Sequence, residues 1–396
     1  MKQQPFTVLI PTRERCRTLK ATIQTCLSQD YDNLTVIVSD NASTDATRDV
    51  VHSFSDPRLR YVNPGRRLSM SANFNFAVEK AGGGMVCSIG DDDGLMPGAI
   101  ARANELLAIH PALPLACRSV FYVWPDFPDS RVRDKIIVRD SADRHVVLES
   151  RRELARRIQF RSRIPYVWGL PGLYRGFLSK ELISRTIRSD RYIHSITPDA
   201  YSVFSTLLHS DRYAFATRPL FIEGVSGSSN GASQSLTVNG SEEERYLSEN
   251  ELAVHPQIVY SPAHAFVMVE AYLQVRDQFP EAARGLEPDL LRMCKVALAE
   301  AGGPKGEQIR RAVEDVRKIH GLPEVAAASD PLSRLSSRWQ ALIRAWRETE
   351  IDGKSCGVRD VYTASIAAQA AWNARRGQGA KSGMSLIAQR LAARIT

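Results

Sequence analysis

Short apolar runs alternate with amphipathic segments over roughly the first 110 residues of the chain. The runs are typical of buried strands, and the segments between them carry apolar residues at three- and four-residue intervals, which is the spacing of a helix. Strands that alternate with helices predict a mostly parallel sheet with helices on both faces. The pattern predicts strands at 6–10, 34–38, 59–62 and 85–89, and helices at 17–28, 43–51, 72–80 and 97–109.

The pattern of apolar and polar residues changes twice beyond this region. Between residues 111 and 240 the pattern is mixed, and from residue 241 onward helical spacing dominates. We therefore place a domain boundary near residue 240 and expect an α/β domain at 1–240 followed by an all-α region at 241–396. A Gly- and Ser-rich stretch at 224–235 predicts a loop. The further elements expected are strands at 120–124, 136–138, 173–175 and 214–222, and helices at 151–160, 200–208, 257–279, 287–301, 305–320, 331–348, 358–375 and 383–396.

The composition is that of a folded protein. Of the 396 residues, 43% are hydrophobic and 24% are charged, and the length exceeds the roughly 250–300 residues at which single domains stop growing. No apolar run approaches the roughly 18 residues of a membrane span, and the run at 6–10 is too short for the core of a signal peptide. We therefore expect a protein that is kept in the cytosol. The six cysteines lie far apart without a C-x-x-C pair, which argues against a zinc site and a disulfide framework.

Positive charge is in excess, because 52 Lys and Arg residues stand against 44 Asp and Glu residues and give a net charge of +8. Such an excess favours phosphorylated ligands, nucleic acid or an anionic membrane surface without choosing among them. Nucleic acid is disfavoured, since the basic residues are not interleaved with aromatic residues in any recognised module.

Two polar motifs follow the first two expected strands, at the edge where open parallel sheets bind ligands. Residues 11–15 read Pro-Thr-Arg-Glu-Arg, and their guanidinium groups can stack on a base or bind a phosphate in a fork; a solvated basic turn is the alternative. Residues 39–45 read Ser-Asp-Asn-Ala-Ser-Thr-Asp. Asp40 lies at the strand tip, where its carboxylate can accept a hydrogen bond from a ring N–H or a sugar hydroxyl. Ser43 or Thr44 is expected to cap the following helix.

A third motif, the acidic run Asp91-Asp92-Asp93, follows the fourth expected strand. In an extended chain Asp91 and Asp93 would point to one side and Asp92 to the other. Three adjacent carboxylates repel each other unless positive charge offsets the repulsion. A divalent cation that also holds a diphosphate fits this requirement, because magnesium-type sites use one or two carboxylates plus substrate phosphates. The alternative is an acidic turn.

As a set and in this order, the three motifs resemble those of the family 2 glycosyltransferases, which have the GT-A fold. The resemblance is carried by Val8–Arg15, Val36–Thr47 and Gly90–Ala99, and it is clear over about 110 residues and looser to about 225. It implies that 1–110 is a nucleotide-binding half and 111–240 an acceptor half. It also implies a sugar-nucleotide donor, usually with uridine, whose diphosphate is bound by Mn²⁺ or Mg²⁺ on an Asp-x-Asp motif.

The resemblance assigns roles to single residues of this chain. The residues implied in binding the nucleotide sugar are Pro11, Thr12, Arg13, Arg15, Asp40, Asn41, Arg67, Asp91 and Asp92, and those implied in binding the metal are Asp91 and Asp93. For Arg67, after the third strand, a solvated loop is the alternative.

A catalytic base is expected about a hundred residues beyond the acidic run, on the acceptor side. Ile196–Ser202 matches this pattern, with Thr197 as N-cap, Pro198 as the first helical residue and Asp199 in the first turn. Asp199 is therefore the candidate base, and its alternative role is to complement the helix dipole. Trp168 is the candidate acceptor platform, because an indole face stacks well on a sugar; core packing is its alternative.

The resemblance implies one in-line displacement that inverts the anomeric centre. An acceptor hydroxyl attacks, Asp199 takes its proton, and the nucleoside diphosphate leaves with help from the metal. The chain lacks the Gln-x-x-Arg-Trp signature of processive synthases, so we expect addition of one sugar to a glycan or lipid-linked acceptor in bacterial cell-envelope synthesis. The alternatives are a sugar-phosphate nucleotidyltransferase and a non-catalytic module that binds nucleotide sugars or membranes.

Two segments near the end of the chain have apolar stripes beside basic residues, at 331–348 and 383–396. Basic amphipathic helices of this kind can lie in a membrane interface, which predicts a peripheral location on the inner face of the cell membrane. The alternative is that the stripes pack against the protein or against a second copy of the chain.

Overall fold

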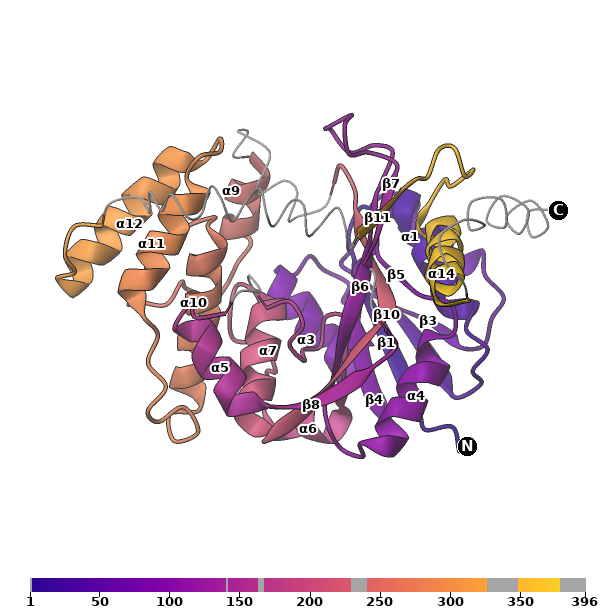
Figure 1. Ribbon diagram of the computed structural model, residues 1–396, viewed down its shortest axis with the longest axis horizontal. Helices are drawn as coiled ribbons and strands as arrows, with labels where there is room; N and C mark the ends of the chain where they lie inside the picture. Colours follow the sequence, from indigo (N-terminus) through magenta and orange to yellow (C-terminus); the bar gives the residue numbers. More distant parts are fainter. Residues whose placement is uncertain (1, 140–141, 163–166, 229–240, 326–347, 378–396) are drawn as a thin grey trace.

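The computed structural model describes residues 2–139, 142–162, 167–228, 241–325 and 348–377 (Figure 1). Its first half contains the four parallel strands expected from the sequence. Strand β1 (Phe6–Thr12) lies between β2 (Leu34–Asp40) and β4 (Met85–Ser88), and β3 (Leu59–Val62) pairs with β2 on the outside.

The same sheet continues through β4 with antiparallel pairs, in the order β11-β7-β6-β9-β4-β1-β2-β3. Strand β10 also pairs with β6 in parallel and with β5 and β8 in antiparallel fashion. This extension confirms the expected α/β class and adds β5, β8 and β11 to the strands expected. The strand expected at 173–175 is displaced, because the structure has β9 directly after it. The additional strands are β5 (Gly94–Leu95), β6 (Leu115–Val123), β7 (Lys135–Arg139), β8 (His145–Glu149), β9 (Gly176–Ser179), β10 (Arg212–Val225) and β11 (Glu348–Asp352).

Helices cover both faces of the sheet, because its central strands are apolar on both sides. In β1, Val8 and Ile10 belong to one apolar cluster and Leu9 to another, and all three are fully buried. The first cluster includes side chains of α1, α4 and α14, and the second includes side chains of α3, α5, α6 and α7. The bounds of these helices in the first 240 residues, together with α2, are α1 (Cys16–Leu27), α2 (Thr47–His52), α3 (Met70–Lys80), α4 (Ala99–Ile109), α5 (Ser150–Ile158), α6 (Lys180–Arg185) and α7 (Pro198–His209).

The C-terminal region is helical over most of the residues that the structure describes, and it contacts the sheet domain in two places. At one end α10 packs on α7, and α11 and α12 form a separate apolar cluster with α10. At the other end β11 pairs with β7, and α14 packs beside α1 (Figure 1). The division at residue 240 stays a prediction. The helices are α9 (Ser241–Ser248), α10 (His264–Gln278), α11 (Leu290–Glu300), α12 (Gly306–His320) and α14 (Val361–Gly377).

The strand β11 corrects the expectation of an all-α C-terminal region. Its segment Glu348–Asp352 has one apolar residue, Ile351. The alternation of apolar and polar residues that predicts a strand is therefore missing. The segment expected as a helix at 331–348 lies outside the described residues except at its end, and the segment at 383–396 lies outside them altogether. Their apolar stripes, and with them the expected membrane contact, stay predictions.

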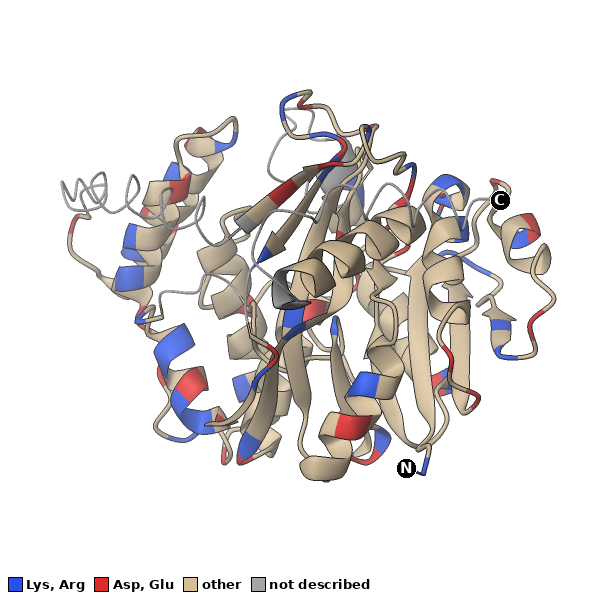
Figure 2. Ribbon diagram, turned by 45° about the vertical axis from the view of Figure 1, so that its right-hand side comes forward, with Lys and Arg blue, Asp and Glu red and all other residues tan. Residues whose placement is uncertain are grey.

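Basic and acidic residues occur together on the surface of the molecule (Figure 2). In α12, Glu307 pairs with Arg311 at 3.0 Å and Glu314 pairs with Arg317 at 2.6 Å. Pairs at this spacing are typical of a solvated helix face. Among the described residues, no helix is at once long and apolar enough to cross a membrane.

Candidate active site

A cleft of about 730 Å³ opens where β1 and β4 end. It is lined by residues of the basic and acidic motifs, by the start of α7 and by the segment that leads into α10. All but two of the predicted site residues line it, the exceptions being Asp40 and Arg67. Those that line it are Pro11, Thr12, Arg13, Arg15, Asn41, Asp91, Asp92, Asp93, Trp168 and Asp199.

The loops after β1 and β2 are joined by Glu14. Its carboxylate accepts hydrogen bonds from the backbone N–H groups of Thr44 (2.8 Å) and Asp45 (3.1 Å), and its own N–H donates to the Ser43 hydroxyl at 2.9 Å. The expectation that Ser43 or Thr44 caps the next helix is therefore wrong. That helix, α2, begins at Thr47, and it is Asp45 that accepts from the Thr47 N–H.

Asp40 is buried behind the cleft rather than exposed in it. Its carboxylate accepts hydrogen bonds from the Tyr61 hydroxyl at 2.6 Å and from the Ser43 N–H at 3.0 Å. Its neighbour Asn41 reaches the cleft and is held in place by two 2.8 Å hydrogen bonds to the backbone of Leu68. The structure thus uses Asp40 to tie β2 to β3, and a direct contact of Asp40 with a ligand stays a prediction.

The acidic run forms a tight turn, closed by a hydrogen bond from the Asp93 N–H to the Gly90 carbonyl at 3.2 Å. The expectation of alternating side chains in an extended chain is therefore wrong. Asp91 accepts from the Thr12 hydroxyl at 2.7 Å, and Asp92 from the Ser226 hydroxyl at 2.7 Å. Asp91 and Asp93 therefore do not share one side of the chain, and each of the three carboxylates has its own hydrogen-bond partner.

Asp93 is the most deeply held of the three acids. Its two oxygens accept hydrogen bonds from the Tyr174 hydroxyl (2.6 Å) and from the backbone N–H groups of Gly224 (2.8 Å) and Gly90 (3.0 Å). With 1% of its surface exposed, Asp93 acts as an acceptor that holds protein groups in place. Asp91 and Asp93 were expected to bind the metal together, but both oxygens of Asp93 already accept hydrogen bonds from the protein.

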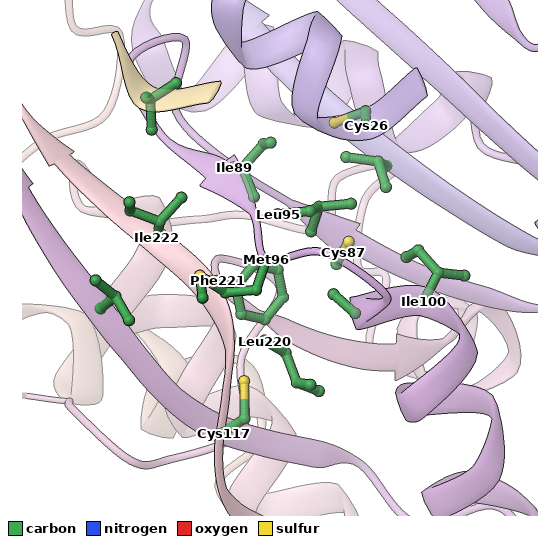
Figure 3. Packing of buried hydrophobic residues seen from close by; sticks show 14 of the residues in the cluster. Cys26, Cys87, Ile89, Leu95, Met96, Ile100, Cys117, Leu220, Phe221 and Ile222 are labelled. Carbon is green, nitrogen blue, oxygen red and sulfur yellow. The ribbon is translucent and has the colours of Figure 1, made fainter. Parts of the chain in front are cut away.

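The acidic turn has a rigid support. Ile89 on one side of it and Leu95 and Met96 on the other are buried in the packed interior (Figure 3). The Thr22 hydroxyl donates to the backbone carbonyls of Asp91 and Asp93 at 2.9 and 2.7 Å. At Gly224 of β10, a Cβ atom would lie 1.8 Å from the Asp92 carbonyl oxygen, so only glycine lets this strand approach the turn so closely.

The surroundings of Asp91 shift the pKa of its carboxyl group in opposite directions. Burial raises the pKa of its carboxyl, while the positive charge of Arg15 and the hydrogen bond from Thr12 act in the opposite direction. Asp91 and Asp92 offer hard oxygen donors, which suit Mg²⁺ or Mn²⁺. Over the described residues there is no group of three or more His, Cys, Asp or Glu side chains arranged to hold a metal. The two carboxylates therefore fit a cation only if a ligand, such as a diphosphate, supplies further oxygens.

Asp199 lines the same cleft as this turn. It lies in the first turn of α7, after Pro198 at the first helical position, as predicted. Thr197 is the N-cap residue, but its side chain makes no capping hydrogen bond, which corrects that part of the expectation. The hydrogen bond to Glu300 is the main cause that raises the pKa of His264, and the negative charge of Asp199 raises it further.

Trp168 lies at the rim of the cleft with 39% of its surface exposed. Its ring packs edge-on against Phe121 at 5.9 Å, and its backbone carbonyl accepts a hydrogen bond from the buried Arg157 at 2.9 Å. The exposure of the indole favours a ligand platform over core packing.

Comparison with known proteins identifies the part of the chain that builds the acidic side of the cleft. Residues 7–171 match the model of Glycosyl transferase family 2. This part of the chain belongs to glycosyl transferase family 2. The match favours the expected glycosyltransferase over the nucleotidyltransferase alternative.

Curated relatives are similar to this glycosyltransferase region over about a quarter of the chain. One is the Campylobacter jejuni GalNAc(5)-diNAcBac-PP-undecaprenol beta-1,3-glucosyltransferase, 34% identical over 107 residues, which are 25% of this chain and 35% of the relative. Another is the Escherichia coli UDP-Glc:alpha-D-GlcNAc-diphosphoundecaprenol beta-1,3-glucosyltransferase WfaP, 26% identical over 110 residues, 28% and 43% of the two chains. The chain thus spans less than half the length of these relatives.

Among solved structures, Staphylococcus aureus TarS 1–349 in complex with UDP-GlcNAc superposes with a TM-score of 0.47 and 13% sequence identity. The superposition covers 80% of this chain and 90% of TarS 1–349.

One residue of the cleft that the sequence analysis did not identify is Glu249, directly after α9. Its carboxylate binds Arg13 at 2.5 Å and Arg67 at 3.0 Å, two of the arginines predicted to contact the donor. Arg67 therefore contacts Glu249, a residue of the cleft, and is not among the lining residues itself. No motif marks Glu249, because it lies 236 residues from Arg13 in the sequence.

Proposed function

We propose that the protein transfers one sugar from a UDP-linked donor to a lipid-linked acceptor, with inversion of the anomeric centre. The observation that carries the proposal is that two acidic groups line one cleft: the turn Asp91–Asp93, within the family 2 match, and Asp199, at the start of α7. An in-line displacement needs these two groups on opposite sides of the reacting carbon. One assists the departing diphosphate, and the other accepts the proton of the attacking hydroxyl.

The donor side is built from the ends of β1 and β4. Thr12, Arg15 and Asn41 surround the space beside the acidic turn, and guanidinium groups suit phosphate recognition. A divalent cation held by Asp91 and Asp92, when bound, would neutralise charge on the diphosphate leaving group. In this proposal Asp93 positions the turn instead of ligating the cation.

The acceptor side is built from α7, Trp168 and the segment that leads into α10. Asp199 is the proposed base, and the exposed indole of Trp168 is the proposed platform for the acceptor sugar. The names of both curated relatives include undecaprenol acceptors linked through a diphosphate. That supports a lipid-linked acceptor and a place of action at the inner face of the cell membrane.

The first test is a donor screen by thermal unfolding. Anything that binds the folded state alone stabilises it, so we expect UDP and one or a few UDP-sugars to raise the melting temperature. The rise should be larger with Mn²⁺ or Mg²⁺ than with EDTA, and GDP and ADP should have smaller effects. Equal shifts for all nucleotides, or no shift at millimolar concentrations, would contradict the proposed donor class.

A further inference from the structure

A buried carboxylate of the C-terminal helices lies behind the loop that carries Asp199. Glu270, in α10, is 2% exposed and is one of the residues that line the cleft. Burial raises the pKa of its carboxyl. A buried charge is costly unless it is hydrogen-bonded, so the partners of Glu270 indicate what it holds.

One of those partners leads to the start of α7, and the others, Gln274 and the backbone of His255, lie within or before α10. The Ser195 hydroxyl donates to Glu270 at 2.5 Å, and the Thr197 backbone N–H donates to the same Ser195 oxygen at 3.0 Å. On its other oxygen Glu270 accepts from Gln274 at 2.9 Å. The result is a chain of hydrogen bonds from Glu270 through Ser195 to Thr197, which is two residues before Asp199.

The loop at 195–197 is held by three elements from different parts of the chain. Ser71 of α3 donates to the Ser195 carbonyl at 2.6 Å, and the Tyr246 hydroxyl of α9 donates to the Ile196 carbonyl. Glu270 adds the third attachment. Because the Thr197 side chain does not cap α7, these bonds fix where the first turn of that helix lies.

The cost of misplacing a proton acceptor is large. Displacing a catalytic group by about 1 Å can cost roughly 10²-fold in rate, and a satisfied buried polar network rigidifies the segment it binds. An apolar residue at position 270 would fill the same space between α7 and α10 without holding Ser195. The carboxylate therefore has a task beyond packing.

We propose that Glu270 is a positioning residue that acts through Ser195 to hold the first turn of α7, and with it Asp199, in place in the cleft. This inference rests on the proposed role of Asp199 as the base. It makes the helical C-terminal region part of the catalytic apparatus, because the family 2 match ends at residue 171 and α10 lies far beyond it.

The test compares Ser195→Ala, Glu270→Ala and Glu270→Gln in the full-length protein, with UDP release as the readout. The assay uses the UDP-sugar chosen in the donor screen and a lipid-diphosphate-linked N-acetylhexosamine as acceptor. We expect Ser195→Ala and Glu270→Ala each to lower kcat by about 10-fold or more, with the dissociation constant for UDP unchanged. Glu270→Gln keeps an oxygen that can accept from Ser195, so it should recover most of the activity.

Two controls separate positioning from folding. Val275→Ala removes a buried side chain of the same helix α10 that makes no bond to the loop, so it should lower the melting temperature and leave kcat unchanged. The double variant Ser195→Ala/Glu270→Ala should lose no more activity than either single variant, because both break one link. If Glu270→Ala does not fold, Ser195→Ala and Glu270→Gln still compare a variant that loses the hydrogen bond to the loop with one that keeps it.

The outcomes distinguish this inference from the function on which it rests. Wild-type kcat in folded Ser195→Ala, beside an inactive Asp199→Asn, would overturn the positioning role and leave the base intact. Loss of activity in Glu270→Gln as large as in Glu270→Ala would also overturn it, since the retained acceptor should suffice. Wild-type activity in Asp199→Asn would overturn the proposed base itself.

Discussion

Replacing Asp199 by Asn is expected to lower turnover by about 10²–10⁴-fold, the usual contribution of a general base. The amide keeps the size of the side chain and its place in the first turn of α7, but it cannot accept the proton of the acceptor hydroxyl. Binding of UDP should be unchanged, because Asp199 lies on α7, outside the basic and acidic motifs that are proposed to bind the donor. Steady-state kinetics together with calorimetric titration of UDP would separate the two effects.

Asp211→Asn is the matched control for this experiment. Asp211 is an exposed carboxylate beyond the other end of α7, so its loss changes the net charge by the same amount without touching the cleft. Its turnover should equal that of the wild type. If Asp199→Asn has the turnover of Asp211→Asn while remaining folded, Asp199 is only a partner of the helix dipole and the proposed mechanism is wrong.

The second large effect is expected at the acidic turn, where Asp91 and Asp93 should respond differently. In Asp91→Asn the amide oxygen can still accept from Thr12, so the fold should persist. The charge that attracts a cation is lost, however. Substitutions that only support a metal ligand cost about 10–100-fold in metal affinity, so loss of a ligand should cost at least as much. We expect the Mn²⁺-dependent part of UDP binding to disappear, and transfer with it.

Asp93→Ala should instead act on stability. It would leave the hydroxyl of Tyr174 and the N–H groups of Gly90 and Gly224 without their acceptor. Each such buried group costs about 1–3 kcal/mol. Thermal unfolding and UDP titration with and without Mn²⁺ would measure both variants. Unchanged Mn²⁺-dependent UDP affinity in Asp91→Asn would exclude Asp91 as a ligand.

The sequence predicts the strands and helices of the first 110 residues well, because their pattern reflects burial on both faces of the sheet. Val8, Leu9 and Ile10 read as a buried strand and are fully buried. Strand β8 was not expected. His145, Val146 and Val147 are all exposed, so the sequence lacks the alternation of apolar and polar residues that predicts a strand. Apolar periodicity misses a strand such as β8, whose side chains do not face the core.

The site was predictable only as far as its residues lie next to strand ends. The positions of the basic motif and the acidic run beside one cleft follow from the order of strands, whereas Asp199, on a helix, was found only through the resemblance to family 2 glycosyltransferases. The directions of the three carboxylates do not follow from that order. Asp91 is held by Thr12, 79 residues before it, and Asp92 and Asp93 are held by Ser226 and Gly224, more than 130 residues beyond the turn. The same holds for Glu249 and Glu270, which reach the cleft from the C-terminal helices by contacts that no local pattern encodes.

The central claim is that the cleft catalyses one inverting sugar transfer, and the stereochemistry of the product tests it most directly. Wild-type protein would be incubated with the α-linked UDP-sugar chosen in the donor screen, Mn²⁺ and a lipid-diphosphate-linked N-acetylhexosamine, and the new glycosidic bond would be examined by NMR. We expect one β-linked sugar per acceptor, formed in step with UDP release. An α-linked product, or consumption of the donor without formation of a glycoside, would contradict the account.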